Sequence, residues 1–382
     1  MGDDCRFGIE EEYLVNDAEK RDVARSRTRD FFESCRKNLP GDVQREMLEP
    51  QVEVATPPSS DFAEARRLLS DLRRGVGEMA ARHGLAVMAA GTHPLAAWSR
   101  VRGTPGPRYG RITRELQLIG SRNVVCGLHV HVEPPAGSSR VGLLNRLQPF
   151  LPLFLALSTS SPFWQGQRTG LLGYRLAAYR EIPRTWLPPF FADEADYGRF
   201  VDTLVRSRAV EDASFLWWVA RRSAMHPTLE LRMADSCTRL DDTLALAALF
   251  RCQVRRLDRD GDLNRGLTGA SHAIVAENCW RAQRYGIHGS FVDEATRTAK
   301  PVSDALSETL ALLREDARAL GCEGELDLCR WILARGTSAD RQLAVFTEAV
   351  GRGRPSRDAL VAVVDALTAE TAGAGRAALR AA

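Results

Sequence analysis

Short segments in which apolar and polar residues alternate dominate the first two thirds of the chain and predict β-strands. Turn signals end the first two of these segments, Asn16-Asp17 after one and Pro57-Pro58 after the other. The predicted strands cover residues 6–15, 47–56, 85–91, 124–133 and 227–235.

Helical spacing of apolar positions accounts for much of the remaining sequence. One helix is predicted to begin at Asp61, which forms a capping-box pattern with Glu64, and to stop at Gly84. A mostly apolar helix is predicted over residues 142–157. From Asp241 onward the pattern is helical almost to the end, with helices near 241–258, 268–284, 302–319 and 357–370.

Strands first and helices last predict an α+β fold with a helical C-terminal portion from about residue 241. We assign residues 1–371 to a single domain. The last residues, 372–382, are rich in Ala, Gly and Arg, and we expect a flexible tail there.

Charge and cysteine usage narrow the class of protein. The formal net charge is +3, and no basic stripe is visible, so we expect small anionic substrates and no nucleic-acid partner. The 8 cysteines are scattered and no leader precedes them, which predicts free, buried thiols in a cytoplasmic protein. The longest apolar stretch, 150–157, is far shorter than a membrane span of about 20 residues, so we expect no membrane association.

Two predicted strands carry candidate metal ligands. Strand alternation puts Glu10 and Glu12 on one face, about 7 Å apart, and puts His129, His131 and Glu133 on one face of another strand. Like charges on one face repel, so a bound cation would explain them, although acids also occur on solvated edge strands. The H-x-H pair could bind zinc, but abundant carboxylates favour Mg²⁺ or Mn²⁺.

Two further segments add acids and an arginine. Glu49 and Glu53 share a face of the second predicted strand, whereas Glu46 falls on the other face unless Pro50 introduces a bulge. In the strand 227–235 the apolar alternation leaves Glu230 and Arg232 on the same side. This pair is either a salt bridge or a metal ligand beside a group that neutralises a transferring phosphoryl group.

Several motifs together resemble a known family. The segments that carry this similarity are Glu10 to Glu12 within Gly-Ile-Glu-Glu-Glu, Val52 to Pro57, Gly127 to Val132, Pro227 to Arg232 and Arg281 to Gly286. Through them the chain is similar to the YbdK-type carboxylate–amine ligases, which form the second family of glutamate–cysteine ligases. The resemblance covers nearly the whole chain. It implies a glutamine-synthetase-like fold, with a curved, mainly antiparallel sheet lining a funnel-shaped site that holds ATP and Mg²⁺. It also implies a reaction in which ATP phosphorylates a carboxylate, that of glutamate, and an amine then displaces phosphate.

The resemblance also implies roles for individual residues. His131 would approach the nucleotide phosphates, and Arg232 would stabilise the transferring phosphoryl group. Because strand parity separates Glu46 from Glu53, either Glu46 lies ahead of the strand or Glu49 takes its place. The metal ligands implied by the motifs are Glu10, Glu12, Glu46, Glu53, His129 and Glu230.

The region 158–191 is long for a loop and rich in arginine and aromatic residues, so we expect it to close over the site. Its arginines Arg168, Arg175 and Arg184 are candidates for clamping the carboxylate of the acid substrate, since the guanidinium fork matches a carboxylate. Trp186 stands where the family has a smaller residue, which predicts a reshaped pocket.

Three other functions are also compatible with the sequence. A phosphotransferase on the same scaffold would use ATP without ligation, and a non-catalytic protein would bind a nucleotide or an amino acid. A zinc hydrolase is the third. The sequence has no P-loop, dinucleotide fingerprint or G-x-S-x-G elbow, so metals and arginines would have to hold any nucleotide phosphates. The amine and the oligomeric state are not predicted, and a homodimer is compatible with the pattern.

Overall fold

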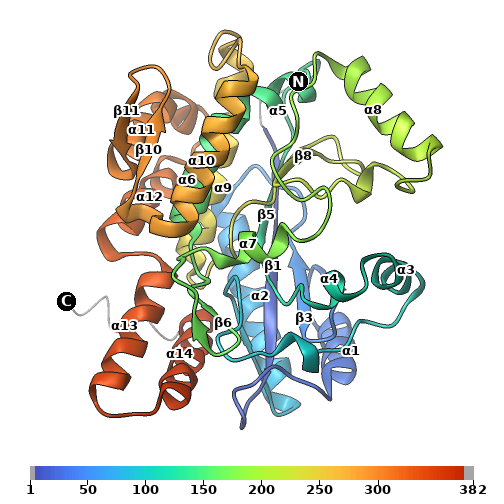
Figure 1. Ribbon diagram of the computed structural model, residues 1–382, viewed down its shortest axis with the longest axis vertical. Coiled ribbons are helices and arrows are strands. Elements are labelled where there is room, and N and C mark those ends of the chain that lie inside the picture. Colours follow the sequence, from blue (N-terminus) through green and yellow to red (C-terminus); the bar gives the residue numbers. More distant parts are fainter. Residues whose placement is uncertain (1–4, 374–382) are drawn as a thin grey trace.

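The computed structural model describes residues 5–373, and an open seven-stranded antiparallel sheet runs through it (Figure 1). Its strand order is β2-β3-β1-β5-β9-β8, and β4 pairs with the C-terminal half of β1. The strands are β1 (Phe7–Asp17), β2 (Asp42–Arg45), β3 (Gln51–Ala55), β4 (Leu85–Met88), β5 (Leu128–Val132), β8 (Ala220–Arg222) and β9 (Leu229–Leu231). The α+β class and the antiparallel sheet predicted above are therefore confirmed.

Two small hairpins stand apart from this sheet. They are formed by β6 (Phe163–Trp164) with β7 (Gln167–Arg168), and by β10 (Ser290–Asp293) with β11 (Thr298–Pro301). The helices of the first two thirds are α1 (Thr28–Asn38), α2 (Phe62–Arg82), α3 (Pro107–Leu116), α4 (Leu118–Ser121), α5 (Arg140–Leu147), α6 (Leu151–Ser158), α7 (Tyr174–Tyr179) and α8 (Glu194–Arg206). The C-terminal helices are α9 (Leu240–Arg259), α10 (Gly269–Tyr285), α11 (Val302–Ala319), α12 (Glu323–Arg335), α13 (Ser338–Gly351) and α14 (Ser356–Thr371).

One face of the sheet builds the hydrophobic core. The alternating apolar residues of β5 and β9, such as Leu128, Val130 and Leu231, are completely buried in one cluster with the apolar residues of α9. On β3, Val52 and Val54 pack in the same way against α2. Because strand residues alternate between faces, the polar residues between these positions are all directed to the opposite face.

The sequence pattern misplaced several boundaries. The predicted strand 47–56 begins only at Gln51, because residues 46–50 form a turn that ends at Pro50, which cannot donate a ladder hydrogen bond. The predicted helix 142–157 is two helices, α5 and α6, separated by a 3₁₀ turn that contains Pro149. Two helices, α12 and α13, and the hairpin β10–β11 were not predicted as separate elements.

The region 158–191 is not one loop. It contains the hairpin β6–β7 and the helix α7, and its first residues, Ser158 to Ser161, are buried.

Among the described residues, one helical stretch, Arg140–Ser158, is long and apolar enough by composition to cross a membrane, and 72% of it is buried inside the protein. The predicted tail lies outside the described residues from residue 374 onward.

Candidate active site

Four neighbouring strands bring the predicted acids and histidines together on the face opposite the core. Backbone pairing sets Glu12 beside Glu53, Glu10 beside His129, and His131 beside Glu230. Directly paired residues of antiparallel strands have Cβ atoms about 5 Å apart, so their side chains meet. The cluster runs diagonally across β3, β1, β5 and β9.

Two groups of three side chains in this cluster could each hold a metal ion. One group is Glu10, His129 and Glu230, the other is Glu12, Glu53 and His129, and in each the ligand atoms lie within 4.8 Å of one another. The Nδ1 atom of His129 lies 3.1 Å from a Glu10 oxygen, and its Nε2 atom is 3.6 Å from Glu12. That Nε2 atom is buried without a hydrogen-bond partner, although carboxylates surround it. An ion between these groups would satisfy it.

The carboxylates of Glu46 and Glu53 carry unfavourable charge in the absence of a cation. Burial and the nearby Glu12 carboxylate raise the pKa of Glu46 to about 8. Burial, followed by the charges of Glu10, Glu46 and Glu12, raises the pKa of Glu53 well above its ordinary value. Buried like charges that lack a fixed partner within the protein favour a bound cation.

Glu230 is held differently, by two arginines. Arg221 donates to both of its oxygens, at 2.6 and 3.0 Å, and Arg232 donates to one of them at 2.5 Å. Burial would raise the pKa of Glu230, but the two guanidinium groups outweigh it and keep the carboxylate ionised. This carboxylate and both arginines therefore form a fixed charged wall beside the metal-binding candidates.

The two histidines at the centre of the cluster both interact with the Glu10 carboxylate. Burial raises the pKa of the Glu10 carboxyl, but the hydrogen bonds from His129 and His131 outweigh this effect and lower it. Burial lowers the pKa of His131, but Glu10 and Glu230 more than compensate and raise it. His131 also hydrogen-bonds through Nδ1 to the Thr228 hydroxyl at 2.9 Å. The raised pKa of His131 favours its positively charged form, which suits a contact with an anionic group.

A cavity of about 390 Å³ opens next to the cluster. Its lining includes the ionisable residues Glu10, Glu12, Glu46, Glu53, His129, Arg175, Arg221 and Arg232. It also includes the apolar and aromatic residues Met47, Tyr109, Ile112, Leu116, Val125, Tyr179, Ile182 and Trp217, and the polar residues Gln44, Gln51, Asn123 and Ser214. The size is sufficient for small substrates beside bound phosphate groups.

The three arginines predicted from the region 158–191 lie in three different places. Arg175, on α7, is 2% exposed and lines the cavity. Its Nη1 atom donates to the carbonyl oxygens of Arg232 and Met233, and its Nε atom is buried without a partner. Its guanidinium lies so close to Gly127 that a Cβ atom there would be 2.1 Å from Nη2, so a larger residue at this position would displace the guanidinium.

The other two arginines do not line the cavity. Arg168 is exposed on the hairpin strand β7. Arg184 donates to the Phe215 carbonyl and lies 3.7 Å from Glu115 of α3. Trp186 is not among the residues that line the cavity, and the Arg180 guanidinium lies 3.8 Å from the centre of its ring. The tryptophan in the cavity lining is Trp217, and a shaping effect of Trp186 on the pocket stays a prediction.

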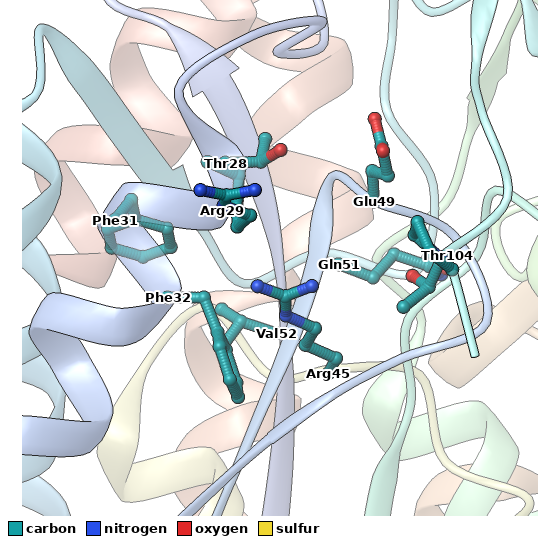
Figure 2. Close-up of a pocket in the computed structure, with 11 residues that line it drawn as sticks. Thr28, Arg29, Phe31, Phe32, Arg45, Glu49, Gln51, Val52 and Thr104 are labelled. Atoms are coloured by element: carbon teal, nitrogen blue, oxygen red, sulfur yellow. The ribbon is translucent and has the colours of Figure 1, made fainter.

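The choice between Glu46 and Glu49 depends on the turn before β3. Glu46 lies ahead of the strand, so strand parity does not apply to it, and it lines the same cavity as Glu53. Glu49 lines a separate, smaller cavity between α1 and β3, together with Arg45 and Thr104 (Figure 2). Glu46 is therefore the better candidate ligand.

Sequence reasoning did not identify Arg221 or the residues of α3. Arg221 reaches Glu230 only because β8 pairs with β9, and its signal was a short strand before Pro227 that contains two arginines. Tyr109, Ile112 and Leu116 follow helical spacing, but nothing in that spacing shows that they face a cavity.

Comparisons with known proteins identify relatives of this chain and agree with its fold. A protein of Bradyrhizobium diazoefficiens named as a glutamate–cysteine ligase 2 is 46% identical over 342 residues, covering 90% of this chain and 80% of that protein. A protein of the same name from Rhodospirillum rubrum is 44% identical over 372 residues, covering 95% of each chain.

Two solved structures share the fold at low sequence identity. Glutamate–cysteine ligase from Francisella tularensis, solved in complex with AMP, superposes with a TM-score of 0.69 at 11% identity and covers 98% of this chain and 93% of that one. A bifunctional glutathione synthetase from Pasteurella multocida gives a TM-score of 0.70 at 15% identity, covering 96% of this chain and 52% of that one.

The sequence profile of glutamate–cysteine ligase family 2 matches residues 6–365. This match contains every acid, histidine and arginine of the site described above. The chain belongs to glutamate–cysteine ligase family 2.

Proposed function

We propose that this carboxylate–amine ligase uses ATP and Mg²⁺ to join the γ-carboxylate of glutamate to a small amine. The main support is the pair of candidate metal sites that share His129. They lie beside the charged wall of Glu230, Arg221 and Arg232 and next to a cavity that is also lined by Arg175, whose buried Nε atom has no hydrogen-bond partner. The site therefore places candidate metal ligands, which serve phosphoryl transfer, next to the Arg175 guanidinium, which can bind a carboxylate.

The residues present fit a hard divalent cation. Five carboxylates, those of Glu10, Glu12, Glu46, Glu53 and Glu230, and one imidazole offer mostly oxygen ligands, which Mg²⁺ and Mn²⁺ prefer over zinc. Bound there, the metal would neutralise the phosphate oxygens of ATP and polarise the γ-phosphoryl group.

The remaining residues have separate tasks. Arg175 would hold the carboxylate of the acid, using the Nε edge that the protein leaves unbonded. Arg232, kept in place by Glu230, would balance the negative charge of the transferring phosphoryl group. Arg221 is a positioning residue, because it donates to both oxygens of Glu230 and so fixes the carboxylate that Arg232 also contacts. His131 would contact the nucleotide phosphates.

The reaction proceeds in two balanced steps. A carboxylate oxygen of the acid attacks the γ-phosphorus of ATP, the bond to the β-phosphate breaks, and ADP and an acyl phosphate are formed. The amine nitrogen then attacks the acyl carbon, the C–N bond forms, and the bond to phosphate breaks. The nitrogen loses a proton, and inorganic phosphate leaves.

The proposal is tested by incubating the purified protein with ATP, Mg²⁺, glutamate and pooled amines. Mass spectrometry should show one ADP for each new γ-glutamyl amide. ADP without any amide, in the presence of hydroxylamine as a small universal acceptor, would favour the phosphotransferase alternative. No ADP with any mixture would leave a non-catalytic binding protein. The homodimer and the cytoplasmic location stay predictions.

A further inference from the structure

The direction of the Arg175 side chain depends on a short helix. Arg175 is the cavity residue that the proposed function assigns to the acid, and it lies on α7, which has only 6 residues and is not part of the main sheet. Most helical stability in proteins comes from tertiary contacts, and a helix this short has little stability of its own. Residues outside α7 must therefore hold Arg175 in place.

A buried carboxylate lies beneath the start of α7. The Ser161 hydroxyl donates to Oδ2 of Asp235 at 2.6 Å, and the backbone N–H of Ser160 donates to the same oxygen at 3.0 Å. All three residues are completely buried. Ser161 Oγ in turn accepts from the backbone N–H of Arg175 at 2.9 Å. A continuous chain of hydrogen bonds therefore runs from the Asp235 carboxylate through the Ser161 hydroxyl to Arg175.

The guanidinium of Arg175 is attached to the same segment of the chain. Its Nη1 atom donates to the carbonyl oxygens of Arg232 and Met233, which shortly precede Asp235. Burial raises the pKa of the Asp235 carboxyl, and the positive charge of Arg175 partly offsets this rise, so the two groups also interact electrostatically. Residues 232–235, with Ser161, thus hold Arg175 at its backbone and at its side chain.

The packing around these hydrogen bonds is tight. A Cβ atom added at Gly91 would lie 2.6 Å from Oδ2 of Asp235 and 3.0 Å from the Cβ atom of Ser161. The Arg175 guanidinium is packed just as closely against Gly127, as described above. Closely packed interiors transmit strain between neighbouring groups. A displacement of Asp235 or Ser161 is therefore expected to reach the guanidinium.

A second segment fixes the residues just before α7. The carbonyl oxygen of Gln283 accepts from the backbone N–H groups of Leu172 and Gly173, at 2.7 and 3.0 Å. Gln283 belongs to the segment 281–286, one of the motifs identified in the sequence. Neither Gln283 nor Asp235 is among the residues that line the cavity. Two segments far apart in the chain thus meet at the start of α7 without contacting the cavity.

We propose that Asp235 and Ser161 are positioning residues for the acid substrate, because they hold Arg175 in the direction in which its guanidinium can bind a carboxylate. The inference rests on the proposed function and adds two residues that do not touch the substrate. The Nε atom of Arg175 has no hydrogen-bond partner among the described residues and is available to the acid. A guanidinium that is already fixed loses less entropy on binding, so this preorganisation strengthens binding of the acid.

The effect should be selective for one substrate. The two groups of candidate metal ligands, which would serve ATP, lie on strands of the main sheet and not on α7. Loss of the hydrogen-bonded chain should therefore weaken binding of the acid and leave binding of ATP nearly unchanged. A general loss of stability would not separate the two substrates in this way.

The first test compares two buried serines, with hydroxylamine as the acceptor. Ser161→Ala removes the link between Asp235 and Arg175, and we expect the KM for glutamate to rise about tenfold, with kcat and the KM for ATP within about threefold. Ser158→Ala is the matched control, because Ser158 is also buried and accepts from the backbone N–H of Asp235 instead of bonding to its carboxylate. An unchanged KM for glutamate in Ser161→Ala, or an equal rise in Ser158→Ala, would overturn the inference.

Two substitutions of Asp235 test the other end of the chain of hydrogen bonds. The Asn side chain can still accept from Ser161 and from the Ser160 N–H, whereas Ala cannot. We expect the KM for glutamate to rise about tenfold in Asp235→Ala and to stay within about threefold of the wild type in Asp235→Asn. Scanning calorimetry checks that each variant is folded. A folded Asp235→Ala protein with the KM of the wild type would contradict the positioning role.

A double-mutant cycle shows whether the effect passes through Arg175. Arg175→Lys should raise the KM for glutamate by itself, because lysine lacks the guanidinium fork. Ser161→Ala should then add less than about twofold in the Arg175→Lys background, since the group that it positions is already lost. Fully additive effects would overturn the inference. A wild-type protein that makes neither hydroxamate nor ADP would fail the proposed function itself, whereas an active ligase that is insensitive to Ser161→Ala would fail this inference alone.

Discussion

Strand β1 carries three consecutive glutamates, which point to opposite faces of the strand and have different surroundings there. Glu11 points into the core, where Arg73 donates to both of its oxygens at 2.5 and 2.9 Å and the hydroxyls of Tyr13 and Thr243 also donate. Glu10 and Glu12 point to the cavity, beside Glu53. All three lie within one strand, yet their partners differ completely.

The pKa values follow this difference. Burial raises the pKa of Glu11, but Arg73 outweighs it and keeps the carboxylate ionised. On the cavity face, His129 and His131 outweigh burial and lower the pKa of Glu10. Burial and neighbouring acids, however, raise the pKa of Glu53, on the adjacent strand β3, well above its ordinary value. A buried carboxylate that the protein neutralises itself stabilises the fold, whereas buried carboxylates that face each other need a cation from solution.

The largest effect is expected from a change on the cavity face. Glu53→Gln removes a candidate metal ligand and should lower turnover about 10⁴-fold or more, about 5.5 kcal/mol of transition-state stabilisation. The metal-free protein should keep its free energy of unfolding within about 1 kcal/mol, because the raised pKa of Glu53 favours its neutral form, which the amide of Gln resembles. Steady-state kinetics and urea unfolding measure the two quantities. Glu78→Gln, at an exposed position, is the control; unchanged turnover in Glu53→Gln would remove this residue from the metal site.

The matching change on the core face should affect stability instead. Glu11→Gln leaves the buried Arg73 guanidinium without its counter-charge and should lower the free energy of unfolding by about 3–5 kcal/mol. Turnover of the molecules that remain folded should change little. If Glu11→Gln lost its activity while it kept its stability, the two faces would not differ as described.

Arg232→Lys tests the charged wall on the cavity face of the sheet. Lysine keeps the charge but cannot bond to Glu230 and a phosphoryl group at once, so kcat should fall by about 10²–10³-fold, or about 2.7–4 kcal/mol. The KM values should change much less. Arg74→Lys, in an exposed helix pair, is the matched control. A kcat equal to that of the wild type would exclude Arg232 from the chemistry.

The smallest effect concerns added metal. Mg²⁺ at 100 times its dissociation constant should stabilise the wild-type protein by about 2.7 kcal/mol and should stabilise Glu53→Gln much less. Scanning calorimetry with and without Mg²⁺ measures this difference. No shift in the wild type at any Mg²⁺ concentration would argue against the metal proposal.

The same measurement has a pH dependence with a definite sign. The pKa of Glu46 is raised from its ordinary value to about 8 in the folded state, so the unfolded chain loses this proton at lower pH. Without metal, the contribution of Glu46 to stability is therefore complete below pH 4.5 and is lost as the pH rises toward 8. Glu46→Gln should flatten this slope, and a slope that persists unchanged would assign it to other groups.

The period of the sequence pattern determined much of the site. Alternation alone placed Glu10 with Glu12, His129 with His131, and Glu230 with Arg232, because successive strand side chains point to opposite faces whatever the fold around them. It also predicted correctly the α+β class and the positions of the longest helices, α2, α9, α10 and α11. These features depend on residues close together in the sequence.

Only the tertiary structure decided how the strands combine. The register between strands sets Glu10 opposite His129 and brings Arg221 to Glu230, and it depends on packing between segments far apart in the chain. The turn before β3 directs Glu46 into the cavity and leaves Glu49 outside it. Arg175 differs from Arg168 and Arg184 through the position of α7, and residues of α3 and Trp217, far apart in the sequence, line the same cavity. Local periodicity contains no information about such distant contacts, because they arise from the burial of the whole sheet.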